Sequence, residues 1–423
     1  MRVFLAIAFT CVMVSAPAVS QRHARTSTQP VHFFLHDGLV NVLCARTDVN
    51  FNGTEDTDDS PAEWRQIDPS SLQTVRSYTF PWANVAASRV GWMPDSNQVF
   101  VGIDSIVHRY TITTMDHTGP VFEDVWPVSA VSATVLPGFG TTLFVSQRPS
   151  FTDPGYVQII TGTEGSLGFV QAGTNVGHTA SFTASDGSPG LLVMSEGKFG
   201  AGDGRLDIWS LTDNENAVKE LTVGDTPNHI ALDSNRAYVT VNGSHWVVVV
   251  DLTLREAVDT ILVGTSGFNG PRESIVDGEK LYVSTFAGDV RIFDIATGNN
   301  IGAIILDAKP EGMLLTGTDL WVTRTFEVDG YAAESNVVVY DLRDAVSVNE
   351  RGRFPASPKA IFAPHGIVTL PAAMVGPLTL TTLDGRIART YTVDSGSCTV
   401  NISDVPSGVY VISSGTHAVT VMR

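Results

Sequence analysis

Residues 223–264 read VGDTPNHIALDSNRAYVTVNGSHWVVVVDLTLREAVDTILVG. Four short runs in this stretch are rich in β-branched and aromatic residues, and turn residues such as Asn242-Gly243 separate them. The runs cover 230–232, 237–240, 246–250 and 260–263. Runs of this kind predict strands, and four strands within about 40–50 residues are typical of one blade of a β-propeller.

The same pattern repeats along the chain. Residues 270–306 read GPRESIVDGEKLYVSTFAGDVRIFDIATGNNIGAIIL, and residues 309–350 contain one more copy. The third run of each unit occurs at 64–68, 107–110, 157–160, 206–209, 246–249, 290–293 and 337–340. This count predicts an all-β, seven-bladed β-propeller over residues 29–355, in preference to one with six or eight blades.

The segment RAYVTVN at 236–242 precedes a valine-rich run that ends in Asp251-Leu252. This combination resembles the YVTN-type, or YncE-like, propeller repeat, and the resemblance is clearest over residues 223–345. It implies the fold. It implies no particular reaction, because propellers carry many functions.

The N-terminus has the pattern of a secretory signal peptide. Arg2 precedes an apolar run at 3–14, and the small residues APAVS follow at 16–20. We therefore expect residues 1–20 to be removed and Gln21 to begin the mature protein. Cys11 leaves with this segment, so only Cys44 and Cys398 remain and no disulfide framework is expected. No later segment is apolar enough to predict a transmembrane helix.

After Pro355 the blade pattern stops. The remaining chain contains LDGR at 383–386, then ISDVPSGVYV at 402–411, then a final run that ends in Arg423. In this order these motifs resemble the type A C-terminal sorting domain of the type IX secretion system. The resemblance implies a small β-sandwich over 359–423, recognised by the outer-membrane export machinery, and a protein that is secreted or held on the bacterial outer cell surface. A plain β-sandwich module, or an extra part-blade at 357–371, are the alternatives.

The net charge of −18 argues against nucleic acid as a partner. Binding to a polyphosphate backbone requires a basic stripe, and the sequence contains none.

A calcium-loop pattern interrupts the first predicted blade. The segment 48–56, DVNFNGTED, fits D-x-[DN]-x-[DN]-G, and Asp59 falls at the twelfth position. The pattern predicts a Ca²⁺ site, in which glycine at the sixth position allows a sharp turn. The predicted ligands are Asp48, Asn50, Asn52, Thr54 through its carbonyl, Asp56 and Asp59. The alternative is a turn that binds no metal.

A second candidate site lies at the mouth of the propeller channel. Loops that join the fourth strand of one blade to the first strand of the next should meet there, together with the loops between second and third strands. The polar residues at equivalent positions are His178, His229, Arg272, Glu273 and Glu311. These residues are consistent with three alternatives: a solvent-filled channel mouth, a site for a polar ligand, or a transition-metal site.

Aromatic residues in the long loops could extend a ligand site at the same face. The loops concerned are 46–62, 147–156, 196–205 and 324–335, and the candidate residues are Phe151, Phe199, Phe326 and Tyr331. Such rings stack on sugars or on other rings, or they anchor the loops.

The sequence contains no HExxH, no G-x-S-x-G and no phosphate-binding glycine loop, so no residue is assigned a catalytic role. The leading hypothesis is a secreted or cell-surface module that binds a small molecule or a glycan. One alternative is an extracellular lyase or hydrolase acting on a polysaccharide or a lactone, with His178, His229 and Glu273 as acid–base candidates. The other is a surface protein that captures a nutrient or cofactor.

Overall fold

The computed structural model describes residues 20–136, 139–161, 165–212 and 217–343. In the C-terminal part it describes 360–362, 367–369, 376–382, 387–393, 399–406, 409–414 and 417–422. Most of the predicted signal peptide, the LDGR turn at 383–386 and Cys398 lie outside the described residues.

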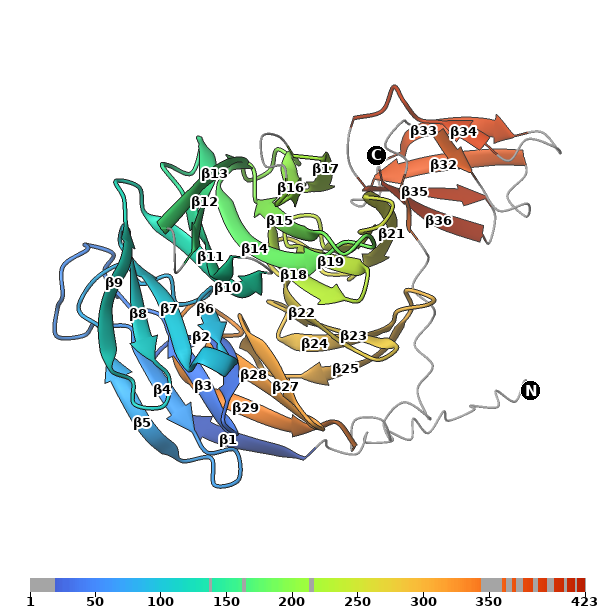
Figure 1. Cartoon of the computed structure of the whole chain (residues 1–423). Helices are drawn as coiled ribbons and strands as arrows, with labels where there is room; N and C mark the ends of the chain where they lie inside the picture. The colour runs from blue at the N-terminus through green and yellow to red at the C-terminus, as the bar shows by residue number, and fades with distance from the viewer. Residues whose placement is uncertain are drawn as a thin grey trace, which may run out of the picture.

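Six consecutive groups of four antiparallel strands form six blades (Figure 1). The first three blades contain β2 (Pro30–His36), β3 (Leu39–Cys44), β4 (Glu63–Ile67) and β5 (Thr74–Thr79); β6 (Gly91–Met93), β7 (Gln98–Ile103), β8 (Ile106–Thr111) and β9 (His117–Glu123); and β10 (Val128–Leu136), β11 (Gly140–Gln147), β12 (Pro154–Thr161) and β13 (Gly165–Thr174). The next three contain β14 (Val176–Thr183), β15 (Pro189–Ser195), β16 (Gly204–Ser210) and β17 (Lys219–Gly224); β18 (Pro227–Asp233), β19 (Arg236–Val241), β20 (Trp246–Asp251) and β21 (Glu256–Leu262); and β22 (Pro271–Asp277), β23 (Lys280–Thr285), β24 (Asp289–Asp294) and β25 (Asn300–Ile305).

The seventh blade joins the two ends of the propeller sequence. Its inner strands are β26 (Ala308–Lys309) and β27 (Met313–Thr316), followed by β28 (Asp319–Glu327) and β29 (Ala333–Asp341). The outer strand is β1 (Gln21–Arg25), which pairs antiparallel with β29, Gln21 opposite Tyr340. Figure 1 shows β1, in blue, beside the orange β29. The propeller thus closes through its N-terminus, and the predicted range of 29–355 does not include this strand.

The propeller core is divided into seven hydrophobic clusters, one between each pair of neighbouring blades. Strand β20 shows how the sequence builds them. Val248 and Val250 pack toward blade four, whereas Val247 and Val249 pack toward blade six. Because successive side chains of a strand point to opposite faces, an uninterrupted valine run suits a strand buried on both faces. The predicted seven-bladed, all-β fold is confirmed.

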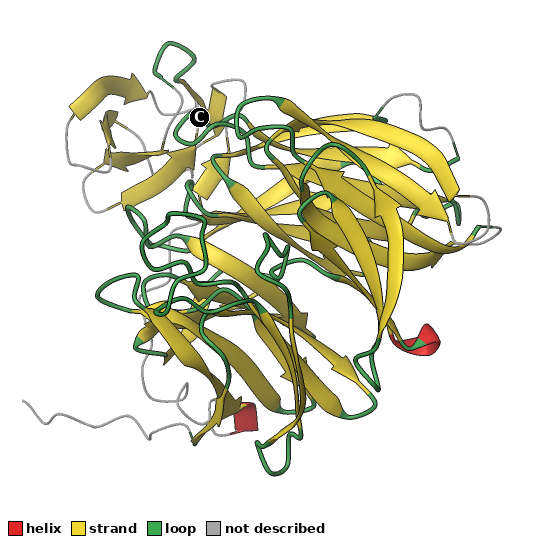
Figure 2. Ribbon diagram, turned by 90° about the vertical axis from the view of Figure 1, so that its left-hand side faces the viewer, coloured by secondary structure: helices red, strands yellow, loops and turns green. Residues whose placement is uncertain are grey.

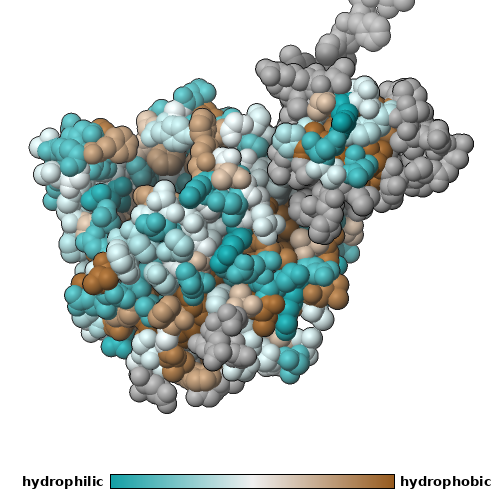
Figure 3. Space-filling model, turned by 90° about the horizontal axis from the view of Figure 1, so that it is seen from above, coloured by the Kyte–Doolittle hydropathy of each residue, from teal (hydrophilic) through white to brown (hydrophobic). Residues whose placement is uncertain are grey.

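First strands such as β2, β14 and β22 lie nearest the centre of the ring, and fourth strands such as β5 and β13 lie outside (Figure 1). The side view in Figure 2 is dominated by strands, and the helical residues that the structure describes form only short turns such as η1 (Pro94–Ser96). Within the described part of the chain, no helix is long and apolar enough to cross a membrane. On the face seen in Figure 3, hydrophobic residues form separate patches amid hydrophilic surface.

The C-terminal part is also built from strands. These are β30 (Ala360–Phe362), β31 (Ile367–Thr369), β32 (Gly376–Thr382), β33 (Ile387–Val393), β34 (Thr399–Asn401), β35 (Val409–Ser414) and β36 (His417–Met422). β30, β36, β35, β32 and β33 form one sheet, and β31 pairs with β34. A separate hydrophobic cluster includes Val368, Leu380 and Ile412.

Candidate functional site

Bulges at the start of the first strands aim polar side chains at the propeller axis. The pairing between first and second strands is interrupted at Pro30/His32, Val128/Ala130, Val176/Thr179, Pro227/His229 and Pro271/Ser274. A bulge inserts an unpaired residue and turns the side chains next to it. In blades four, five and six these side chains include the predicted His178, His229, Arg272 and Glu273.

Three of the predicted residues tie neighbouring blades together, and we call them the inner ring: His178, His229 and Glu273. The Nδ1 atom of His178 accepts a hydrogen bond from Ile230 N (3.1 Å), and Nδ1 of His229 accepts one from Ser274 N (3.3 Å). The Glu273 carboxylate accepts one from Met313 N (3.1 Å). Each of these side chains thus accepts a hydrogen bond from the first strand of the next blade. The donor is the residue that follows the equivalent position in that strand, as Ile230 follows His229 and Ser274 follows Glu273.

The ionisation of the inner ring follows from its burial. Burial lowers the pKa of His178 and of His229 well below the ordinary value, and the positive charge of Arg89 adds to the effect. Both imidazoles are therefore neutral, and because Nδ1 is an acceptor in each, the proton sits on Nε2. The His229 Nε2 atom lies 3.3 Å from Glu273 Oε1. Burial raises the pKa of Glu273 to about 7, against the opposing effect of Arg89.

At the ring position of blade seven stands Gly312. A Cβ atom there would lie 2.7 Å from Val31 O, so blade one approaches too closely for any side chain. Both ring nitrogens of His32, the neighbour of Val31, are buried, and neither has a hydrogen-bond partner among the described residues. Burial first, and Arg89 second, lower the pKa of His32 to about 3, so this ring is neutral too.

Above the inner ring lies a cavity of about 340 Å³, which we call the channel cavity. Residues from all seven blades or their connecting loops border it, and its charged residues are Arg89, Arg148, Glu196, Arg272 and Glu311. Starts of first strands and ends of second strands both contribute, so the two predicted sets of loops do meet at one face. His178, Arg272 and Glu311 border the cavity, whereas His229 and Glu273 are buried behind its wall.

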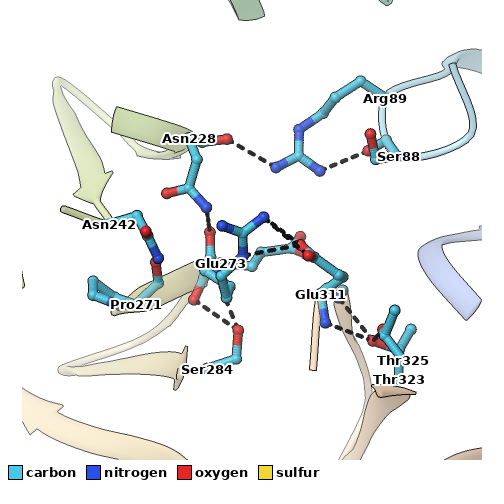
Figure 4. A network of polar contacts seen from close by, with 12 residues as sticks. Ser88, Arg89, Asn228, Asn242, Pro271, Glu273, Ser284, Glu311, Thr323 and Thr325 are labelled. Atoms are coloured by element: carbon cyan, nitrogen blue, oxygen red, sulfur yellow. Dashed lines mark hydrogen bonds and ion pairs between the residues drawn. The ribbon is translucent and has the colours of Figure 1, made fainter. Parts of the chain in front are cut away.

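Arg89 reaches into this cavity from the loop before β6 (Figure 4). Its Nη1 donates to Ser88 O (2.6 Å) and its Nη2 donates to Asn228 O (3.0 Å) in blade five. Asn228 in turn donates through Nδ2 to Arg272 O (2.7 Å). The Arg89 side chain therefore links blade two to blade five directly, and Asn228 extends the link to blade six.

The other arginines of the cavity have acidic or amide partners. Arg272 forms a two-pronged ion pair with Glu311, with distances of 2.7 and 3.0 Å, and its guanidinium lies over the Phe286 ring. Arg148 donates to Asn175 Oδ1 (2.7 Å), and Asn175 Nδ2 donates to Glu196 (2.7 Å). Burial raises the pKa of Glu196.

The predicted aromatic residues lie on the rim of the same face. Phe151 is 67% exposed, and its ring is covered by Arg148 at 4.2 Å. Phe199 is 70% exposed and stacks on Phe268, with ring centroids 6.1 Å apart. Phe326 contacts Phe286 and Tyr331 edge to face. Of the three rings Phe286, Phe326 and Tyr331, that of Tyr331 is the most exposed.

The predicted calcium loop lies between β3 and β4, with its side-chain oxygens turned inward. Asp48 accepts hydrogen bonds from Asn52 N and Gly53 N, and Asp56 accepts them from the amide groups of Asn50 and Asn52. Asp59 accepts from Val49 N and Asp56 N (both 2.8 Å). Thr54 N donates to Asn52 Oδ1. Gly53 adopts a left-handed conformation (φ 76°), as expected for the sixth position.

Trp82 donates a hydrogen bond through Nε1 to Gly53 O (3.2 Å), which anchors the loop to the connection between blades one and two. Throughout the described residues, no three His, Cys, Asp or Glu side chains gather closely enough to hold a metal ion.

Sequence reasoning missed Arg89, Arg148, Glu196 and Asn228. Asn228 directly precedes the predicted His229, and Arg272 precedes Glu273 in the same way. Aligning these pairs with Arg89-Val90 in blade two would have indicated Arg89. Strand β6 has only three residues, so the sequence offers too short a strand pattern to align blade two with the other blades.

A larger hollow of about 780 Å³ lies elsewhere, between β13 and the strands β16 and β17. Its arginine, Arg205, is already paired with Asp207 and Glu220. We therefore place the candidate site at the channel cavity.

No known protein family matches this chain, and no curated protein matches it.

Proposed function

We propose that this protein is a secreted or cell-surface binding module that holds a small polar ligand in the channel cavity. One observation carries the proposal: bulged first strands and loops from around the ring bring charged side chains to a single cavity of about 340 Å³. Ligand sites are concave and contain a few converging polar groups. The exposed aromatic rim would extend the contact to a sugar or ring outside the cavity.

Catalysis receives less support than binding. Two of the three acid–base candidates, His229 and Glu273, lie behind the cavity wall. Their polar atoms bond neighbouring blades. A general acid or base must reach the substrate.

The export proposal rests on motifs at both ends of the chain. The signal-peptide pattern ends at Ser20, directly before β1. In the C-terminal part, the Tyr410 hydroxyl donates to Pro406 O (2.8 Å), so a hydrogen bond joins the first and last residues of the PSGVY motif. These features support the sorting-domain interpretation. The YncE-like character of the propeller is a separate part of the proposal and rests on the RAYVTVN segment at 236–242.

Calcium is proposed as a structural ion of the 48–59 loop. As they lie in this described loop, its carboxylates do not form a group of three close enough to hold a metal ion, and the ion would draw them together. The oxygens of Asp48, Asp56 and Asp59 point into the loop, where they accept backbone and amide hydrogens. Carboxylate and carbonyl oxygens are the ligands that Ca²⁺ prefers. The ion would order the loop rather than take part in a reaction.

Filling the cavity tests the binding function. A side chain at Gly177 has room, because its Cβ would meet Met194 at 3.7 Å and Glu196 at 3.8 Å, both ordinary contacts. We expect Gly177→Val to abolish retention of the ligand that native mass spectrometry detects on protein purified from its own producer. The matched control is Leu254→Phe, an exposed position in the turn between β20 and β21. Retention of the same ligand by Gly177→Val would refute this site.

A further inference from the structure

We propose that the channel cavity binds its ligand through an anionic group, a carboxylate or a phosphate, held by Arg89 and His178. This inference rests on the proposed binding function, and it adds the chemistry of the ligand.

The first observation is the unpaired charge of Arg89. Among the described residues its guanidinium bonds two carbonyl oxygens, Ser88 O and Asn228 O, which leaves three of the five N–H groups that an arginine carries. Among the described residues, no carboxylate lies within ion-pair distance of it. Arg89 is half-buried, and a cation partly withdrawn from water is costly unless an anion accompanies it.

The neighbouring carboxylates are already engaged. Glu311 is held by Arg272 and Glu196 by Asn175, while the Glu273 carboxyl bonds Met313 N and faces His229. The cavity wall therefore contains three arginines against two glutamates, a surplus of one positive charge that the buried Glu273, with its pKa of about 7, offsets only in part near neutral pH. This surplus occurs in a chain whose net charge is −18, so it is a local feature of the cavity.

His178 supplies a further donor beside Arg89. Since its Nδ1 accepts a hydrogen bond from Ile230 N, its proton is on Nε2. His178 borders the cavity, and no other described residue accepts a hydrogen bond from Nε2. A bound carboxylate or phosphate would satisfy this N–H and the free N–H groups of Arg89 with charge-assisted hydrogen bonds. A neutral ligand would offer Arg89 no partner charge.

Paired probes test the inference on the full chain. Galacturonate and galactose differ by a carboxylate, and glucose 6-phosphate and glucose differ by a phosphate. By isothermal titration calorimetry, we expect one or both anions to bind more tightly than the matched neutral sugar. Arg89→Gln should weaken anion binding by roughly 10- to 100-fold, the cost of losing one charge-assisted pair. Arg89→Lys should retain part of the affinity.

Arg291→Gln is the matched control, because Arg291 is a half-buried arginine that also donates to a backbone carbonyl, Val263 O, outside the cavity. Thermal melting of each variant separates loss of binding from loss of fold. If the neutral sugars bind as well as the anions, and Gly177→Val abolishes that binding, the proposed function stands and the anion inference fails. If folded Arg89→Gln binds the anions normally, or neither anion binds the wild type, the inference also fails.

Discussion

Asp207 lies on the face of β16 that packs against blade three, and its side chain has no exposed surface. The side chain of Arg205 lies 2.9 Å away, and Glu220 stands opposite on β17. Burial raises the pKa of Asp207 to about 7, Arg205 opposes the rise and Glu220 adds to it. Since the folded pKa is above the ordinary value, the folded protein holds a proton that the unfolded chain has released. The contribution of Asp207 to stability is therefore full at low pH and is lost as the pH rises toward 7.

The substitution Asp207→Asn removes this ionisation. We expect the variant to lose part of the decline in unfolding free energy between pH 5 and pH 8, with a gain at pH 8 on the order of 1–3 kcal/mol relative to wild type. Urea unfolding at both pH values measures it, with the exposed Asp277→Asn as control. An unchanged pH dependence in Asp207→Asn would contradict the assignment.

His229 connects two blades with one side chain. Replacing it by alanine leaves Ser274 N without its acceptor and the Glu273 carboxyl without its neighbour. We expect His229→Ala to lower the free energy of unfolding by roughly 1–3 kcal/mol, the cost of buried polar groups left unpaired. Denaturant unfolding measures the loss, and the exposed His117→Ala provides the comparison. Equal midpoints for the two variants would show that the inner ring adds no stability.

The carboxylates of Asp48, Asp56 and Asp59 hold the conformation of the 48–59 loop through hydrogen bonds. If it binds Ca²⁺, the ion stabilises the folded state by mass action, about 2.7 kcal/mol at a concentration one hundred times Kd. We expect the melting temperature to rise with Ca²⁺ and to fall with a chelator. The effect should vanish in Asp48→Asn and in Asp59→Asn, and it should persist in Glu55→Gln, an exposed residue of the same loop that the pattern does not use. A melting temperature insensitive to Ca²⁺ would leave the loop as a hydrogen-bonded turn.

Strand β1 fills the last place in the seventh blade. Ala24 is 1% exposed and packs with Val337 and Val339 of β29, whereas His23 beside it is exposed. We expect Ala24→Asp to cost about 3 kcal/mol or more, because an unpaired charge would be buried. His23→Asp tests the opposite face of the same strand and should change little. Equal unfolding curves for the two variants would show that β1 does not close the ring in solution.

The elements were predictable to different degrees. Blades five to seven follow from third strands rich in β-branched and aromatic residues, WVVVV at 246–250, VRIF at 290–293 and VVVY at 337–340, because a strand buried on both faces needs that composition. β1 was not predictable, because its sequence QRHAR has neither alternation nor β-branched residues and owes its conformation to pairing with β29. The mouth residues were predictable as a group from their equivalent positions. The sequence could not show which of these residues border the cavity and which lie buried behind its wall, because the bulges determine the direction of each side chain.

At the scale of the whole molecule, removal of the signal peptide would change the mass of the protein, and so would removal of the C-terminal domain, which its resemblance to a type IX sorting domain implies. We expect the form recovered from the producer's surface or medium to begin at Gln21 and to lack residues 359–423. Intact-mass spectrometry measures both ends at once. The substitution Ala18→Arg, which places a large charge at a small-residue cleavage position, should retain residues 1–20. A recovered protein with a complete C-terminus would contradict removal of the proposed sorting domain.

The N-terminal position of β1 has a consequence for the order of folding. Its partner β29 is made last among the propeller strands, so a chain that emerges N-terminus first holds β1 unpaired until almost the whole propeller has followed. Unpaired strand edges attract other chains, and charged side chains reduce that attraction. Arg22 and Arg25 flank His23 and Ala24 in this five-residue strand. The charged composition that made β1 unpredictable as a strand thus also reduces its tendency to aggregate during the time before β29 has been made.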